Sequence, residues 1–435
     1  MPTAFADPAG LPAFTRRDTL DAIPAHHWPA LAASGLQSLT LAGRRLLPIV
    51  QGGMGVGVSA HRLAGAVAAQ GGVGTLSAVD LRRHHPDLMA RTEGLALRVG
   101  RDADTKAQID AANLEAVERE VRAARIAAGG RGLIAMNVMR AVSGYAAYVQ
   151  RALDAGVDMV VVGAGLPLDL PDLAADHPQA LLVPILSDAR GVALIVKKWE
   201  RKKRLPDAIV IEHPRLAGGH LGAARIADLN DPRFDFERVI PASLDFLREA
   251  GLAGCIPLIV AGGIRSCEDI SRLQALGAAG VQLGTPFAVT TECDASDAFK
   301  RVLAEARDED LVEFTSVAGL PARAVGTPWL RAYLKIEPRL QAVAHAKSRC
   351  TKAFDCLAQC GLRDGTPGWG QFCIDNQLAA ALRGDLKKGL YFRGVGALPF
   401  GAQIRSVRAL IERLLTRGLD LPAPPGLGAA VAVPA

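Results

Sequence analysis

The segment Leu46-Leu47-Pro48-Ile49-Val50-Gln51-Gly52-Gly53-Met54-Gly55 shows the pattern that decides the fold. A short apolar run ends in a glycine-rich loop, and an amphipathic segment, His61–Gln70, follows it. The run does not alternate between apolar and polar residues, which is typical of a parallel strand covered on both faces. Outward from this segment, the same unit of apolar run, loop and amphipathic segment recurs to about residue 308.

Eight apolar runs of this kind follow one another along the chain. They are Leu46–Gln51, Val73–Ser77, Leu133–Asn137, Met159–Gly163, Leu181–Leu186, Ala208–Glu212, Pro257–Ala261 and Gly280–Leu283. Strand and helix repeated eight times predict an α/β fold of the (β/α)8 TIM barrel type, with a doubly wound open sheet as the alternative. The stretch Leu81–Asp110 is too long for a simple connection, so we expect it to insert a helical segment beside the barrel mouth.

The length of 435 residues allows a barrel and an extension. We expect an N-terminal segment over residues 1–45, the barrel over 46–337, a helical extension over 338–418 and a flexible tail rich in proline and glycine over 419–435.

Charge and composition restrict the partners and the compartment. The net charge is +6, and residues from Pro338 onward hold 13 Lys and Arg against 6 Asp and Glu, without aromatic residues interleaved for base stacking. The N-terminus lacks the pattern of a secretory signal, no apolar run is long enough to span a bilayer, and seven cysteines do not suggest a disulfide framework. We expect a cytoplasmic protein that binds neither nucleic acid nor membrane, and we leave its oligomeric state open.

The segment Ala217–Gly222 places one histidine, His220, between glycines just after the sixth strand. Glycines such as Gly219 allow the backbone to approach a flat ligand closely. Histidine exchanges protons near neutral pH, so His220 is the candidate catalytic residue.

Other candidate residues follow the strands at the end where barrel enzymes carry their chemistry. The loop after the first strand, with Gln51, Gly52 and Met54, has neither a dinucleotide-binding nor a phosphate-loop pattern, so close approach to a planar ligand is its expected use. Asn137 ends the third strand and either faces the mouth or caps the next helix.

Glycine clusters follow the seventh and eighth strands, where barrels commonly bind a phosphate. They contain Gly262 and Gly263 in the first, and Gly284 with Thr285 in the second. A phosphate site beside a place for a flat ring fits flavin mononucleotide (FMN).

The cysteine spacings favour thiols that pack in the core over metal ligands or reactive thiolates. Cys350, Cys356, Cys360 and Cys373 have spacings that fit neither the usual zinc sites nor the common iron–sulfur sites, so we expect buried thiols and no metal. Cys293 has no cationic neighbour in sequence that would stabilise a thiolate.

Taken together, these motifs resemble the nitronate monooxygenase (2-nitropropane dioxygenase) family of FMN-dependent barrel oxidoreductases. The segments that carry the resemblance are Pro48–Gly55, Asn137, Ala217–Gly222, Ala261–Ile264, Val281–Thr285 and Gly319–Arg323. The resemblance implies that the FMN phosphate lies at the two glycine clusters, that the ring lies near Gln51, Gly52, Met54 and Asn137, and that His220 faces its reactive side. His213, Arg215 and Leu216 depart from the family pattern and indicate an altered substrate pocket.

Three functions are consistent with these residues. The leading one is the oxidation of alkyl nitronates and nitroalkanes, a small-molecule substrate, by O2 to carbonyl compounds and nitrite. The second is an NAD(P)H-dependent flavin oxidoreductase of the enoyl-acyl-carrier-protein reductase or quinone reductase type. The third is a barrel scaffold without catalysis.

Overall fold

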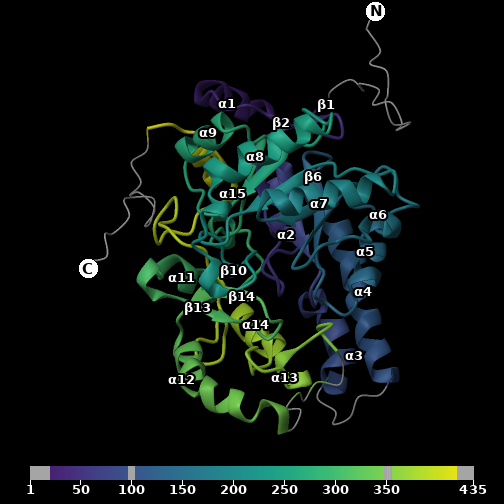
Figure 1. The fold of residues 1–435 in the computed structure, drawn as a ribbon, viewed down its shortest axis with the longest axis vertical. Helices are drawn as coiled ribbons and strands as arrows, with labels where there is room; N and C mark the ends of the chain where they lie inside the picture. Colours follow the sequence, from purple (N-terminus) through teal and green to yellow (C-terminus); the bar gives the residue numbers. More distant parts are fainter. Residues whose placement is uncertain (1–19, 97–102, 347–349, 351, 353–354, 419–435) are drawn as a thin grey trace, which may run out of the picture.

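The computed structural model describes residues 20–96, 103–346, 350, 352 and 355–418. Eight parallel strands form a closed barrel in the order β11-β12-β4-β5-β6-β7-β8-β9. Figure 1 shows the ribbon, with helices such as α4 (Ala103–Ala128) and α5 (Tyr145–Asp154) on the outside of the molecule. The barrel strands are β4 (Ile49–Gln51), β5 (Val73–Ser77), β6 (Leu133–Met139), β7 (Met159–Gly163), β8 (Leu181–Leu186), β9 (Ile209–Glu212), β11 (Leu258–Ala261) and β12 (Gly280–Leu283). The predicted (β/α)8 barrel is confirmed, and the open sheet is excluded because β12 pairs with β4 and closes the ring.

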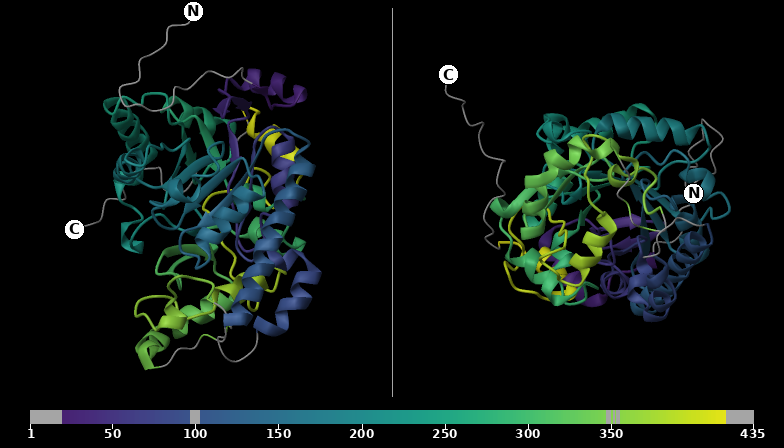
Figure 2. Two further views of the ribbon diagram at one scale, coloured as in Figure 1. Left: turned by 90° about the vertical axis from the view of Figure 1, so that its right-hand side faces the viewer. Right: turned by 90° about the horizontal axis from the view of Figure 1, so that it is seen from below.

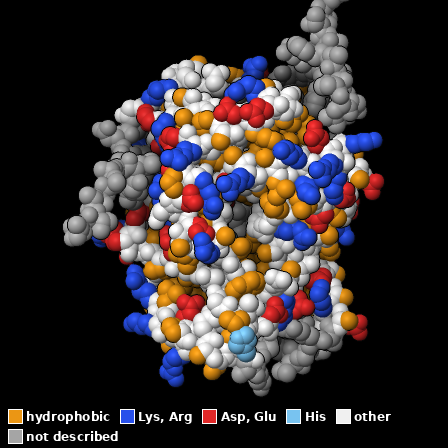
Figure 3. Space-filling model, in the orientation of Figure 1, with side chains coloured by type: hydrophobic (Ala, Val, Ile, Leu, Met, Phe, Trp, Pro, Cys, Tyr) orange, Lys and Arg blue, Asp and Glu red, His pale blue; other side chains and the backbone are white. Residues whose placement is uncertain are grey.

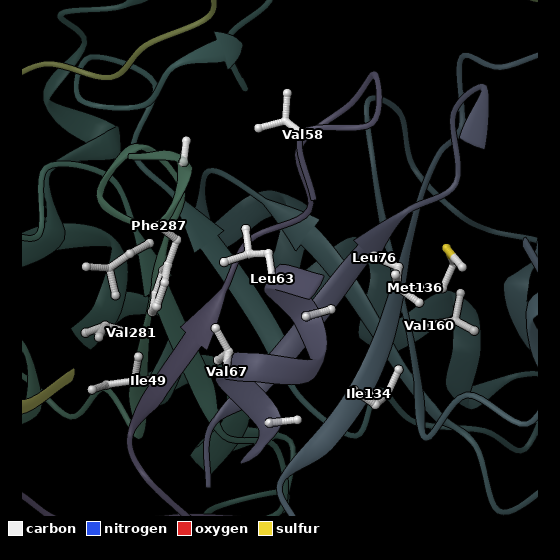
Figure 4. Close-up of a cluster of buried hydrophobic side chains, with 14 of the residues drawn as sticks. Ile49, Val58, Leu63, Val67, Leu76, Ile134, Met136, Val160, Val281 and Phe287 are labelled. Atoms are coloured by element: carbon white, nitrogen blue, oxygen red, sulfur yellow. The ribbon is translucent and has the colours of Figure 1, made fainter. Parts of the chain in front are cut away.

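Each barrel strand buries both of its faces, which explains why the runs lack polar alternation. Leu133 and Met159 point into the barrel interior, whereas Ile134 and Val160 point outward to the surrounding helices. Figure 4 shows this outer layer, where strand side chains meet those of α2, such as Leu63. Two apolar layers therefore hold the barrel, one inside the strands and one between strands and helices.

Helices follow the barrel strands along the chain, and the first of them lies within one residue of the predicted segment His61–Gln70. They are α2 (His61–Ala69), α4 (Ala103–Ala128), α5 (Tyr145–Asp154), α6 (Leu170–Leu173), α7 (Ala189–Glu200), α8 (Phe236–Glu249), α9 (Cys267–Ala275), α10 (Thr285–Ala288) and α11 (Asp297–Glu305). The stretch Leu81–Asp110, which is expected to insert a helical segment, contains α3 (Pro86–Ala96) and the first residues of α4.

The N-terminal part contains α1 (Trp28–Ser34) and a small sheet in the order β1-β3-β2. Its strands are β1 (Leu20–Asp21), β2 (Leu39–Leu41) and β3 (Arg44–Leu46). Leu46 pairs with Leu39 in this sheet, so the predicted first strand, Leu46–Gln51, is in fact divided between two sheets. The side chains of Leu39 and Leu46 join the inner barrel core, so this small sheet packs against the barrel interior.

The segment after the barrel strands packs at one end of the barrel beside α3 and α4, as the green-to-yellow ribbon of Figure 2 shows. It contains β13 (Leu311–Thr315), β14 (Pro321–Val325), α12 (Pro328–Ala342), α13 (Gly361–Asp364) and α14 (Ile374–Leu382). The expected boundary between residues 337 and 338 falls inside α12. The expected tail, 419–435, lies outside the described residues.

A buried ion-pair network attaches this segment to the barrel. Asp375 lies 2.6 Å from Lys352 Nζ and 3.2 Å from an Nη of Arg83, which precedes α3. Arg83 also pairs with Asp80, and Arg82 Nε lies 2.8 Å from the same carboxylate. These side chains are all at least four-fifths buried, so losing one partner would leave an uncompensated charge in a poorly solvated place.

The last helix, α15 (Val407–Leu414), returns to the barrel wall. It contacts α2 and α10, and Leu410, Ile411 and Leu414 belong to the same core as the outward-facing barrel residues. Ser406 caps its N-terminus by accepting a hydrogen bond from the Ala409 amide. The last helix of the expected extension, 338–418, thus belongs to the outer layer of the barrel.

The surface carries mixed charge. Basic and acidic side chains are interspersed over the face in Figure 3. Among the described residues, no helix has the length and apolar character needed to cross a membrane.

If α15 completes the barrel, Ile411→Ala should lower the free energy of unfolding by about 2–5 kcal/mol, as expected for truncating a fully buried aliphatic side chain. Arg408→Ala, on the exposed face of the same helix, should change it by no more than about 0.5 kcal/mol. Denaturant unfolding of both variants measures the difference, and equal stability of Ile411→Ala and the wild type would contradict the assignment.

Candidate active site

A cavity of about 670 Å³ lies at the carboxyl ends of the barrel strands. The loops that follow the strands line it, and so do residues 355–357, 390 and 392–398 of the C-terminal segment. Nine of the ten predicted site residues border this cavity: Gly52, Met54, Asn137, Gly219, His220, Gly262, Gly263, Gly284 and Thr285.

Gln51 is the exception, because its side chain makes hydrogen bonds within the barrel wall. Its side chain is fully buried and does not border the cavity. The amide accepts a hydrogen bond from Thr75 N at 2.8 Å and donates one to Thr75 O at 3.1 Å. Gln51 therefore joins β4 to β5, and the strand register turns it away from the mouth.

The loop after β4 requires glycine because Asn137 lies against it. A Cβ atom on Gly53 would come within 2.3 Å of Asn137 Cβ. Asn137 lies inside β6, and the N-cap of the next helix, α5, is Gly144. Of the two uses left open for Asn137, the structure supports the one facing the cavity.

His220 lies on a short strand, β10 (Gly219–His220), rather than in a free turn. β10 pairs with β14, so His220 is opposite Ala322. On the other side, a Cβ atom on Gly218 would lie 2.3 Å from Gly394 N. The imidazole is therefore held between the antiparallel sheet and residues 392–394 of the C-terminal segment.

One ring nitrogen of His220 has a protein partner. His220 Nε2 lies 3.0 Å from the hydroxyl of Ser316, which is itself fully buried. The ring centroid lies 5.5 Å from that of Phe392. Burial lowers the pKa of His220 to about 4, so the ring is neutral at physiological pH.

Arg323 on β14 fixes the backbone that leads to His220. Its buried guanidinium donates hydrogen bonds to the carbonyl oxygens of Pro214 and Ala217, and its Nε donates to Glu313 at 3.2 Å. Removing Arg323 would leave these buried carbonyl groups unsatisfied. Arg323 is thus a positioning residue for the His220 loop.

The two glycine clusters after β11 and β12 are adjacent because these strands pair, with Ala261 opposite Gln282. Gly262 and Gly263 have φ values of 116° and 70°, a region that side chains other than glycine rarely adopt. Thr285 Oγ1 accepts a hydrogen bond from Gly394 N at 3.1 Å, which ties the C-terminal segment to this part of the cavity.

Several charged residues of the cavity wall were not predicted as site residues, and two of them follow β9 and β11. Glu212 ends β9, and burial raises the pKa of its carboxyl to about 7. Arg265 directly follows the first glycine cluster and is 6% exposed. The signal in the sequence was their position, since each comes at or just after the carboxyl end of a barrel strand.

The residues that depart from the family pattern occupy two different places. Asp235 Oδ1 lies 3.6 Å from His213 Nε2 and 3.1 Å from Arg215 Nη2. Neither His213 nor Arg215 borders the cavity. Leu216 does border it and packs against Gly262 and Gly263. Of the three departures, Leu216 is the one that alters the cavity wall.

The cysteines are free thiols. Burial, with Asp375 and the neighbouring thiols, raises the pKa of Cys356 well above its usual value, and burial raises that of Cys373 to about 11. Cys293 donates to Val58 O at 3.3 Å, and burial raises its pKa to about 12. Within the described part of the chain, no three His, Cys, Asp or Glu side chains are arranged to hold a metal ion.

Comparison with known sequences gives one family. The family model described as nitronate monooxygenase matches residues 44–417. A probable nitronate monooxygenase of Staphylococcus saprophyticus is 31% identical over 118 residues, which cover 27% of this chain and 31% of the relative. A probable nitronate monooxygenase of Staphylococcus haemolyticus is 25% identical over 162 residues, which cover 37% of this chain and 43% of the relative. The alignments thus span less than half the length of these curated relatives.

Solved structures share the fold at low identity. FabK from Thermotoga maritima has a TM-score of 0.58 and 19% identity, covering 90% of this chain and 95% of its own. Nitroalkane oxidase from Streptomyces ansochromogenes has a TM-score of 0.55 and 20% identity, and the match covers 88% of this chain and 96% of the oxidase.

Proposed function

The chain belongs to the nitronate monooxygenase family, and from this premise we propose that it is an FMN-dependent oxidoreductase that oxidises alkyl nitronates and nitroalkanes with O2 to carbonyl compounds and nitrite. The observation that carries the proposal is a neutral, half-buried histidine held at the wall of a large cavity at the carboxyl ends of the barrel strands. When bound, FMN supplies the redox chemistry with substrate and O2.

The volume of the cavity and its lining residues support a bound flavin. Gly262, Gly263, Gly284 and Thr285 would hold the phosphate, because backbone N–H groups without side chains leave room for its oxygens. Gly52, Met54 and Asn137 would contact the ring. The Nε and Nη1 groups of Arg265 are buried without a hydrogen-bond partner among the described residues, so they could donate to an anion in the cavity.

His220 would bind the reacting end of the substrate. Ser316 holds Nε2, so Nδ1 is the nitrogen left without a hydrogen-bond partner in the described structure. A neutral imidazole can accept a proton from the carbon of a nitroalkane, or donate a hydrogen bond to the charged oxygens of a nitronate. Burial of the ring keeps it in this neutral form over the whole physiological range.

The first prediction concerns His220. His220→Asn should keep bound FMN but reduce turnover of a nitroalkane by roughly 100-fold or more, the cost of losing a general base. Because the pKa of His220 is about 4, wild-type activity that depends on the neutral ring should be lost only as the pH falls through about 4. Steady-state kinetics with nitroethane, together with the flavin spectrum of each variant, measure both effects.

The matched control is His177→Asn, a histidine paired with Asp154 away from the cavity, which should leave turnover unchanged. Equal turnover of His220→Asn and the wild type would remove His220 from the mechanism.

A second prediction follows from Glu212. With a pKa of about 7, its carboxyl is neutral below pH 7, and it becomes an anion in the cavity as the pH rises. Since a nitronate is also an anion, KM for ethylnitronate should increase roughly tenfold above pH 8, through like-charge repulsion. Glu212→Gln should abolish that increase, whereas Glu237→Gln, at an exposed carboxylate on α8, should preserve it. The same pH profile in Glu212→Gln as in the wild type would contradict this role.

One observation favours the second candidate, an NAD(P)H-dependent flavin oxidoreductase for an enoyl thioester or a quinone. The C-terminal segment lines the cavity with apolar side chains, among them Leu357, Ile374, Leu378 and Leu390. Such a wall suits an acyl chain or a quinone ring better than a short nitronate.

Anaerobic mixing separates the two candidates. If the first holds, ethylnitronate bleaches the flavin and NADH or NADPH does not. Rapid bleaching by either nicotinamide would establish the reductase instead. A colourless protein that takes up no added FMN would exclude both and favour a scaffold.

A further inference from the structure

The loop after β11 presents a buried cation to the cavity. Arg265 follows Gly263 and Ile264, and all three border the cavity. Its side chain is 7% exposed, and neither Nε nor Nη1 has a hydrogen-bond partner among the described residues. A buried guanidinium without acceptors is unfavourable, so a ligand oxygen is the expected partner.

Neighbouring carboxylates are already engaged. Asp269 accepts the backbone N–H of Arg265 at 3.0 Å, but its oxygen lies 3.9 Å from Arg265 Nε, beyond hydrogen-bond distance. Asp308 accepts from Gly396 N at 2.7 Å and lies 3.8 Å from Arg393. The cation is therefore not neutralised by a close hydrogen-bonded carboxylate.

The backbone around Arg265 leaves space for a compact anion. Gly396 faces the guanidinium, and a Cβ atom there would lie 3.7 Å from Nη1. Gly262 and Gly263 precede Arg265, and Gly284 follows the neighbouring strand. Gly396 is thus the glycine that lies beside the guanidinium, and the two glycine clusters border the same cavity.

We propose that Arg265 binds the terminal phosphate of the flavin and thereby selects the phosphorylated cofactor, FMN, over riboflavin. This inference rests on the proposed function, since it assigns a partner to a residue of the same cavity. A guanidinium can donate two parallel N–H groups to a phosphate dianion, and this pairing is stronger than donation from backbone amides alone. Arg265 would therefore supply the charge, and the glycine loops the shape, of the phosphate site.

The test compares FMN and riboflavin on the same protein. After removal of bound flavin, Arg265→Gln should weaken FMN binding by roughly 10- to 100-fold, the loss expected for a hydrogen bond to a charged group. Riboflavin binding should be unchanged, because riboflavin has no phosphate. Arg265→Lys, which keeps the charge but not the paired donors, should lose less than Arg265→Gln. Flavin fluorescence titration measures each dissociation constant.

Arg272→Gln is the matched control, because it removes the same charge at an exposed position on the following helix. It should leave both dissociation constants unchanged, and thermal unfolding checks that every variant is folded. A third titration uses inorganic phosphate alone as the ligand. Stabilisation by inorganic phosphate equal to that by FMN would show a free anion site and overturn the proposal.

The remaining outcomes separate this inference from the proposed function. Wild-type protein that binds FMN, with Arg265→Gln binding it equally well, overturns the role of Arg265 alone. Equal weakening of FMN and riboflavin in Arg265→Gln also overturns it, because the phosphate would not be the group recognised. Wild-type protein that binds no flavin overturns the proposed function together with this inference.

Discussion

The parallel pairing of β12 with β4 is the contact on which the rest of the structure depends. It joins Val281 to Ile49 and closes eight strands into a ring, so that all eight carboxyl ends face one mouth. Closure also brings the loops after β4, β11 and β12 together, although more than 200 residues separate the first from the others. The proposed flavin site exists only because these loops become neighbours.

A second level of organisation acts on His220 through the C-terminal segment. The antiparallel pairing of β10 with β14, the Arg323 hydrogen bonds and the Gly218–Gly394 approach confine the loop that carries it. The same contacts exclude water, which lowers the pKa of the imidazole. The same contacts thus set the position and the protonation state of His220. They come from residues outside the strand-and-helix units of the barrel.

Much of the barrel and most of its mouth could be predicted, because these features are local. Apolar runs without polar alternation, separated by amphipathic segments, identify strands covered on both faces, and the predicted strand ends differ little from the observed ones. Residues near the carboxyl end of a strand, such as Asn137 in β6 and Gly262 after β11, reach the mouth wherever their strand lies in the ring. The side chain of Gln51 does not border the mouth, because it accepts a hydrogen bond from the backbone of Thr75 in β5.

The sequence by itself was therefore enough to predict the fold class, the loops that form the mouth and the candidate histidine. Each of these follows from residue types and their short-range spacing. Long-range packing alone decided the partners and charges in the cavity. Ser316 lies 96 positions from His220 in the sequence. Similarly, more than 100 residues separate α15 from α11, although both pack on the barrel. Glu212 and Arg265 gain their roles from burial, which depends on every segment that covers them. Burial and hydrogen-bond partners are properties of the folded chain as a whole, and no local pattern of residues encodes them.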